Sequence, residues 1–312
     1  MLSIPIARFF LRRLELALWW VPRVHVFGRA EVSPWRFGRD IQVLIQPDQL
    51  PQDAARCMSL PLHRVAAGGL CRFGPDHAGV RKAVLWGDSH ALVLLPAFEA
   101  LAQAKDIQIN FAGRSSCLPL LDGTVGSETP TKKDDCNAFN DAMVSAVQRI
   151  HPDVTILSGF WTTHSAQGAE TKSASAPARG QKWNWAKTTV PVRATGSKVC
   201  VVLDVPYLPY AAPYALAMAR RRNLDSSFIH VNRSDVEAQY SAFEVSARAQ
   251  EETNGVIVAD PKVALCPGTR CEIESNGRLL YRDSNHLSRV GAMFVRSALE
   301  PCLGRDDDSP RE

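Results

Sequence analysis

Short apolar runs alternate with longer amphipathic segments along most of this sequence, and that alternation limits the fold more than any other feature. The apolar runs have the length of strands, whereas the segments between them have the period of helices. We predict strands at residues 83–87, 107–112, 154–157, 198–205 and 256–259, and helices near 91–104, 137–150, 234–252 and 287–299. Because successive parallel strands need a crossover of a dozen or more residues, the pattern predicts an α/β fold. We expect a three-layer α/β/α sandwich with a central parallel sheet of the flavodoxin-like kind.

The bulk numbers fit one folded domain with extensions. At 312 residues the chain is long for an average domain, but α/β domains often reach 200 to 250 residues. The apolar fraction of 46% and charged fraction of 22% are ordinary for a globular protein. A net charge of +4 is small and dispersed, so nothing in the sequence indicates a nucleic-acid partner.

We expect the domain at residues 80–303, preceded by an N-terminal segment at 1–79 and followed by a disordered tail at 304–312. Prolines and the pair Gly68-Gly69 interrupt any periodicity between residues 22 and 80, which indicates a linker. The polar stretch from about Thr162 to Ser197 predicts a long mobile loop near the site, because long loops in compact domains are usually functional or disordered.

Two short motifs carry the chemistry. Gly87-Asp88-Ser89-His90 directly follows the apolar run 83–86, so the turn that leaves a buried strand can expose the Ser89 hydroxyl at the carboxyl edge of the sheet. Almost two hundred residues later stands Asp283-Ser284-Asn285-His286. This second motif supplies a base, His286, and a carboxylate that fixes its tautomer, Asp283. The two motifs together indicate acyl transfer through Ser89.

These motifs resemble those of the SGNH (GDSL-type) hydrolases, whose first block carries the nucleophile in Gly-Asp-Ser and whose last block is Asp-x-x-His. The longer phrases VLWGDSHALVLLPAFEALA at 84–102 and LLYRDSNHLSRVGA at 279–292 are similar to one branch of the family. In that branch the SGNH domain is fused to, or works with, membrane-bound acyltransferase-3 proteins that O-acetylate bacterial surface polysaccharides. The resemblance covers roughly residues 80 to 300 and implies the catalytic set Ser89, Asp283 and His286.

An oxyanion hole is the other requirement of such a site, and here the sequence departs from the family pattern. The backbone N–H of Ser89 is one expected donor, and Gly113, after the second strand, is the candidate for the next. Where many members have Gly-x-Asn-Asp, this chain has Ser158-Gly159-Phe160-Trp161. Trp161 either shapes the acyl pocket, donates its indole N–H, or packs on the sheet as a strand-end aromatic residue.

Six of the eight cysteines lie as close sequence pairs in loops: Cys57 with Cys71, Cys117 with Cys136, and Cys266 with Cys271. None has the spacing of a zinc site, so we predict three disulfides and no metal or other cofactor. Disulfides persist in oxidising compartments, which places the protein in the bacterial periplasm or on the outer face of the inner membrane. Cys200 lies in an apolar strand and is predicted to be a buried thiol; Cys302 has no predicted partner.

The amino terminus shows no clean signal peptide. Four charges interrupt residues 1–21, so this segment is too polar to span a membrane. An interfacial helix with Trp19 and Trp20 at the level of the headgroups and a solvated helix packed on the domain are both compatible with it.

The expected function is acyl transfer, with acetyl as the group implied by the resemblance, to hydroxyls of a polysaccharide. The donor would be a separate acyltransferase-3 protein. Hydrolysis shares the same acyl-enzyme, so a carbohydrate O-acetyl esterase is the alternative. A catalytically silent glycan-binding module with the same fold is a third.

Overall fold

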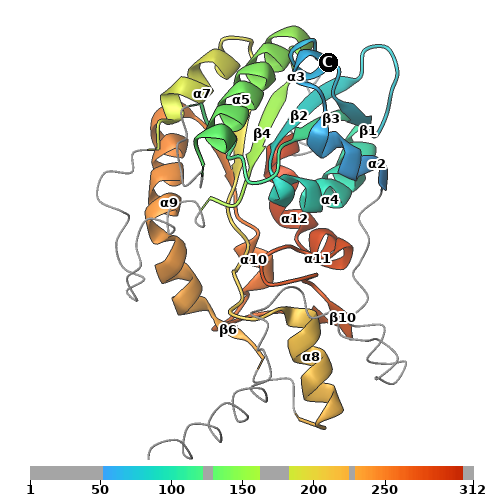
Figure 1. Cartoon of the computed structure of the whole chain (residues 1–312), viewed down its shortest axis with the longest axis vertical. Helices are drawn as coiled ribbons and strands as arrows, with labels where there is room; N and C mark the ends of the chain where they lie inside the picture. Colours follow the sequence, from blue (N-terminus) through green and yellow to red (C-terminus); the bar gives the residue numbers. More distant parts are fainter. Residues whose placement is uncertain (1–51, 122–128, 162–182, 225–228, 305–312) are drawn as a thin grey trace, which may run out of the picture.

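The computed structural model describes residues 52–121, 129–161, 183–224 and 229–304. Its centre is a six-stranded sheet in the order β1-β3-β2-β4-β5-β7 (Figure 1). The strands are β1 (Cys71–Phe73), β2 (Arg81–Gly87), β3 (Ile107–Gly113), β4 (Val154–Ser158), β5 (Lys198–Val202) and β7 (Ile257–Ala259). Five strands run parallel, as predicted, whereas β1 pairs antiparallel with β3 at one edge. The sheet is therefore mixed, although mostly parallel.

Both faces of the sheet are buried under helices. Alternate residues of each strand point to opposite faces, and in β2 Ala83 and Leu85 face one core while Val84 and Trp86 face the other. The first core lies under α4 (Ser89–Lys105), α11 (Arg289–Phe294) and α12 (Arg296–Leu299). The second lies under α5 (Pro130–Ile150), α7 (Trp185–Arg193) and α9 (Arg233–Asn254). The predicted three-layer α/β/α sandwich is confirmed.

The remaining elements surround this sandwich. They are α2 (Gln52–Ala55), the 3-10 helix η2 (Arg56–Ser59), α3 (Leu62–Ala66), α8 (Ala212–Arg221), β6 (Val231–Asn232), α10 (Lys262–Leu265), β8 (Arg270–Cys271), β9 (Glu274–Ser275), β10 (Arg278–Leu279) and the 3-10 helix η4 (Glu300–Leu303). β9 pairs with β10, and β6 pairs with β8.

The linker prediction is wrong for residues 52–80. This segment contains α2, η2, α3 and the edge strand β1, and Cys57 and Val65 are fully buried in it. Elements of three to five residues are too short to show a period in the sequence, so their packing is decided by contacts with β3 and α5. The candidate helix at 1–21, interfacial or packed on the domain, lies outside the described residues.

The predicted loop at 162–197 is also partly wrong. Residues 185–193 form α7, whose Trp185 and Val192 are buried against the second core. Pro191 lies inside this helix, and a proline in a polar, threonine-rich stretch argues against a helix when only the sequence is read. Residues 162–182 lie outside the described part of the chain, as does the tail after Gly304.

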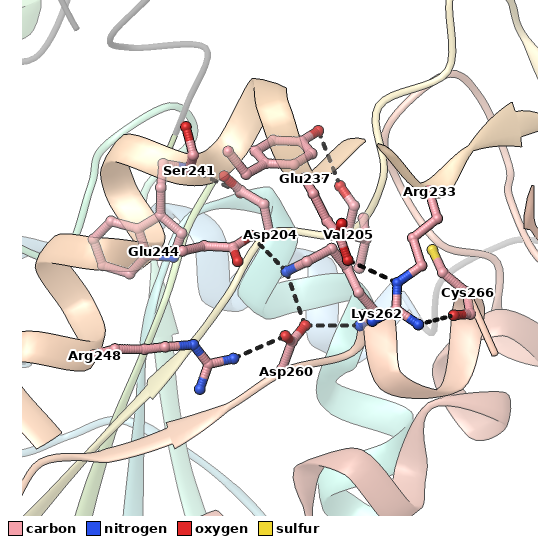
Figure 2. A network of polar contacts seen from close by, with 12 residues as sticks. Asp204, Val205, Arg233, Glu237, Ser241, Glu244, Arg248, Asp260, Lys262 and Cys266 are labelled. Carbon is pink, nitrogen blue, oxygen red and sulfur yellow. Dashed lines mark hydrogen bonds and ion pairs between the residues drawn. The ribbon is translucent and has the colours of Figure 1, made fainter. Parts of the chain in front are cut away.

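A buried ion network fixes α9 to the segment after β7 (Figure 2). The Lys262 ammonium lies 2.7 Å from a Glu244 carboxylate oxygen and 2.8 Å from Asp260, and its side chain is only 8% exposed. Arg248 also contacts Asp260, at 3.1 Å. A buried lysine is tolerated because two carboxylates neutralise it, and the network holds the start of the chain segment that leads to Asp283.

The structure contains the three predicted disulfides, Cys57–Cys71, Cys117–Cys136 and Cys266–Cys271. The prediction of a free thiol at Cys200 is wrong, because Cys200 on β5 pairs with Cys302 in η4, 102 residues later. Four disulfides indicate an extracytoplasmic domain. No helix among the described residues combines the length and the apolar character that crossing a bilayer requires.

Candidate active site

The nucleophile motif occupies the carboxyl end of the central strand β2. This strand has β3 on one side and β4 on the other, both parallel to it, so its end is the point at which the connections of the sheet diverge to opposite sides. Ligands of open α/β sheets bind at such a point. Gly87 is required there, because a methyl group on its Cα would lie 1.7 Å from the Ser158 carbonyl oxygen. Ser89 follows as the first residue of α4 and is half-buried.

The last motif reaches the same edge through a tight loop. Tyr281 and Leu287 form an isolated antiparallel bridge, and the Arg282 N–H donates to the His286 carbonyl at 3.0 Å. This narrow loop presents Asp283 and His286 toward Ser89.

A continuous hydrogen-bonded chain connects the three predicted catalytic residues. His286 Nε2 lies 2.8 Å from the Ser89 hydroxyl, and His286 Nδ1 lies 2.8 Å from Asp283 Oδ2. Because the carboxylate can only accept, Nδ1 carries the proton and donates to Asp283, which leaves Nε2 as an acceptor for the Ser89 O–H. The second carboxylate oxygen, Oδ1, accepts from the backbone N–H groups of Asn285 and His286 at 2.9 and 2.7 Å.

These contacts keep Asp283 ionised. Partial burial alone would raise the pKa of its carboxyl group, but the hydrogen bond and the charge of His286 and the two backbone donors outweigh it and lower the pKa to about 2. A carboxylate that stays charged at neutral pH holds the imidazole in the tautomer that a general base needs.

Asp88 is a structural residue of the site that the sequence reasoning missed. Its buried carboxylate caps α4 by accepting from the His90 N–H at 2.8 Å and accepts from the Phe160 N–H at 3.0 Å. It therefore ties the nucleophile turn to the end of β4. Burial raises the pKa of Asp88 to about 6, against the lowering effect of the two backbone donors and of His286. The sequence feature that could have predicted this role is the position of Asp88 between a strand and a helix, where aspartate is a favoured helix cap.

Two of the predicted oxyanion residues, Ser89 and Gly113, lie at the carboxyl edge of the sheet. Ser89 is the first residue of α4, where a backbone N–H has no intrahelical partner. Gly113 lies beside Gly87 in the register of β2 and β3, so it is at the correct edge of the sheet.

Trp161, by contrast, belongs to the second core. Its indole N–H donates to the Val202 carbonyl at 2.8 Å, and its fully buried ring stacks on Phe243 at 4.8 Å. The two functional alternatives for this residue are wrong, and the packing alternative describes it.

The described residues contain no group of three or more histidine, cysteine or acidic side chains placed to hold a metal ion. The chemistry that this arrangement supports directly is nucleophilic attack by Ser89 with His286 as the base.

Comparison with known proteins agrees with this geometry. Residues 56–301 match the family described as the SGNH domain fused to AT3 domains. The periplasmic domain of a lipopolysaccharide acetyltransferase from Salmonella ser. Paratyphi A is similar in structure, with a TM-score of 0.56 and 13% identity. That match covers 82% of this chain and 98% of the other.

Two further structures are more distant. TesA has a TM-score of 0.40 and 15% identity over 72% of this chain and 98% of its own. A salicylyl-acyltransferase from a tetracycline biosynthetic pathway has a TM-score of 0.40 and 11% identity, and the match covers 76% of this chain and 58% of that one. No curated protein is similar enough in sequence to match.

The family match spans more than half of the chain and includes both motifs that meet at Ser89. This membership makes the chain an SGNH-type enzyme that transfers acyl groups or hydrolyses acyl esters. The chain belongs to the SGNH family, in the branch whose domains are fused to AT3 domains.

Proposed function

We propose that this domain transfers an acyl group, acetyl in the first place, to hydroxyls of a cell-surface polysaccharide through an acyl-Ser89 intermediate. The observation that carries the proposal is the chain of two 2.8 Å hydrogen bonds from Ser89 through His286 to Asp283. A serine hydroxyl is a weak nucleophile near neutral pH, and this arrangement supplies the base that it lacks.

In the first half-reaction Ser89 Oγ attacks the carbonyl carbon of the acyl donor while its proton moves to His286 Nε2. The charge that develops on the carbonyl oxygen is stabilised by backbone N–H groups, for which we propose Ser89 and Gly113. When the intermediate collapses, the bond to the leaving oxygen breaks and that oxygen takes the proton from His286. The product is an ester on Ser89. Asp283 stabilises the imidazolium throughout.

In the second half-reaction a sugar hydroxyl gives its proton to His286 and attacks the acyl-serine, and the proton then returns to Ser89 Oγ. The fusion to AT3 domains in this family supports an AT3 module as the acyl donor. The four disulfides support the bacterial periplasm or the outer face of the inner membrane as the location.

Ser89→Ala tests the nucleophile. With p-nitrophenyl acetate as donor, wild-type protein should form an acetyl adduct on the peptide that contains Ser89, detected by mass spectrometry, and Ser89→Ala should form none. Ser145→Ala is the matched control, because Ser145 is a half-buried serine on α5 whose hydroxyl bonds to the Asp141 carbonyl of its own helix. Equal turnover by Ser89→Ala and wild type would refute the nucleophile assignment.

The acceptor is tested separately. Adding an oligosaccharide to the acetylated enzyme should give an acetylated sugar, and a positioned hydroxyl should compete far better with water than its concentration implies. Rapid ester hydrolysis, deacetylation of acetylated polysaccharide and no acetylated sugar even with an AT3 partner would replace transfer by the esterase function.

A further inference from the structure

A row of aromatic rings extends outward from the proposed base. The His90 ring, one residue after the nucleophile, lies with its centre 4.7 Å from that of His286. Phe160 stacks on His90 at 4.4 Å with an angle of 18° between the rings, and Tyr207 follows at 6.2 Å and 21°. The three rings come from α4, the end of β4 and the segment after β5, and together they form one aromatic row beside Ser89.

The row changes from buried to exposed along its length. His90 is almost fully buried, Phe160 is half-buried, and Tyr207 is 39% exposed. Burial explains the inner two rings as packing of the site. It does not explain a large aromatic side chain left in contact with solvent at the outer end, because such a ring gains stability by being covered.

The backbone that carries Tyr207 is held firmly. Its N–H donates to the hydroxyl of the buried Tyr240 at 2.8 Å. The next N–H, of Leu208, donates to the Ser284 carbonyl at 2.7 Å, and that of Ala212 donates to the Asp283 carbonyl at 3.3 Å. The segment with the exposed ring is thus bonded directly to the segment with the catalytic carboxylate. A tyrosine fixed in this way can bind a ligand with little loss of conformational entropy.

We propose that Tyr207, backed by Phe160, forms the binding platform for a pyranose ring of the acceptor glycan, with the C–H face of the sugar on the exposed face of the Tyr207 ring. This inference rests on the proposed function and adds a site for the acceptor to it. A pyranose suits the platform because it has an apolar face to cover the ring and hydroxyls at its edge that stay hydrated or turn toward Ser89. A flexible acyl chain would need an enclosed apolar pocket instead, and the platform opens to solvent at Tyr207.

Tyr207→Ala tests the platform, with maltotetraose and chitotetraose as acceptors and p-nitrophenyl acetate as donor. The measured quantity is the ratio of sugar acetylation to ester hydrolysis as a function of acceptor concentration. For whichever tetraose serves as acceptor, Tyr207→Ala should raise the half-saturating concentration about tenfold and lower the ratio accordingly. Tyr207→Phe keeps the aromatic face and should restore the ratio to within twofold of wild type.

Tyr214→Ala is the matched control. Tyr214 on α8 is 50% exposed, similar to Tyr207, but it is not part of the aromatic row, so its removal should leave the acceptor dependence unchanged. The inference is wrong if Tyr207→Ala has the acceptor dependence of wild type, or if Tyr214→Ala weakens it equally.

Direct binding separates this inference from the proposed reaction. Saturation-transfer NMR with the Ser89→Ala protein should detect the same tetraoses, and the additional change Tyr207→Ala should reduce the signal. If this Tyr207-dependent binding is found but wild type acetylates no sugar, the platform stands and the transferase proposal fails. If no tetraose binds to Ser89→Ala, the platform is refuted whatever the reaction.

Discussion

Replacing Asp283 with asparagine should shift one proton of His286 from Nδ1 to Nε2, so that His286 can no longer act as the base. In the wild type, Asp283 Oδ1 accepts two backbone N–H groups while Oδ2 accepts from His286 Nδ1. The asparagine carbonyl can keep the backbone bonds, which turns its NH₂ group toward Nδ1. Since NH₂ cannot accept, Nδ1 must lose its proton and Nε2 must carry it. The Nε2–H then points at Ser89 and cannot take the serine proton.

The expected loss follows from this geometry. In serine-protease triads the same change lowers turnover by about 10⁴. The Asp283 side chain is 42% exposed and that of His286 is 24% exposed, so water can stabilise the imidazolium in part. We therefore expect a loss of about 10³ to 10⁴ in kcat/KM for p-nitrophenyl acetate, equivalent to about 4 to 5.5 kcal/mol of transition-state stabilisation.

The assay combines kinetics with ¹⁵N NMR of the His286 ring, which reports directly which nitrogen is protonated. Asp283→Asn should fold like the wild type, because both backbone bonds survive, and should show the proton on Nε2. Turnover within tenfold of wild type would contradict the role of Asp283. A large loss with the proton still on Nδ1 would contradict the tautomer argument and assign the loss to the missing charge.

Other perturbations should act on stability. The pKa of Asp88 is about 6 in the folded state against 3.8 for an ordinary aspartate, so the folded state binds the proton more tightly than the unfolded state. The contribution of Asp88 to the free energy of unfolding therefore falls by about 2 to 3 kcal/mol as the pH rises from 4 to 7. Urea titrations should show this slope in wild type and lose it in Asp88→Ser, which keeps the helix cap. Replacing both Cys200 and Cys302 with alanine opens a loop of 102 residues, and urea denaturation should show a loss of about 4 to 5 kcal/mol; a loss under 1 kcal/mol would contradict the loop argument. Lys262→Met leaves the Glu244 carboxylate uncompensated, whereas Asp260 keeps Arg248, and should cost about 3 to 5 kcal/mol; Glu244→Gln should recover part of this loss in the double variant, and no recovery would contradict the charge argument.

The fold class and the reactive motifs follow from local stretches of the sequence. The strand segments 83–86 and 199–202 are buried on both faces and therefore appear as continuous apolar runs that need no tertiary information. The motifs at Ser89 and His286 can also be identified from the sequence, because each lies in one short segment: a strand followed by a turn, or a loop followed by a helix. Because Asp283 and His286 are only three positions apart, one short loop must carry both side chains.

Features that depend on contacts between distant segments could not be predicted from the sequence. Cys200 finds Cys302 across 102 residues because η4 packs against β5, and nothing local to either cysteine records that contact. Trp161 follows the end of β4, from which its side chain could turn to either face of the sheet. Stacking on Phe243 of α9 determines that it packs in the second core. The alignment of His90, Phe160 and Tyr207 likewise depends on three separate connections ending at one sheet edge. The hydrophobic periodicity of a segment shows which of its side chains are buried. Which other segment covers them depends on packing and on loop closure over the whole chain.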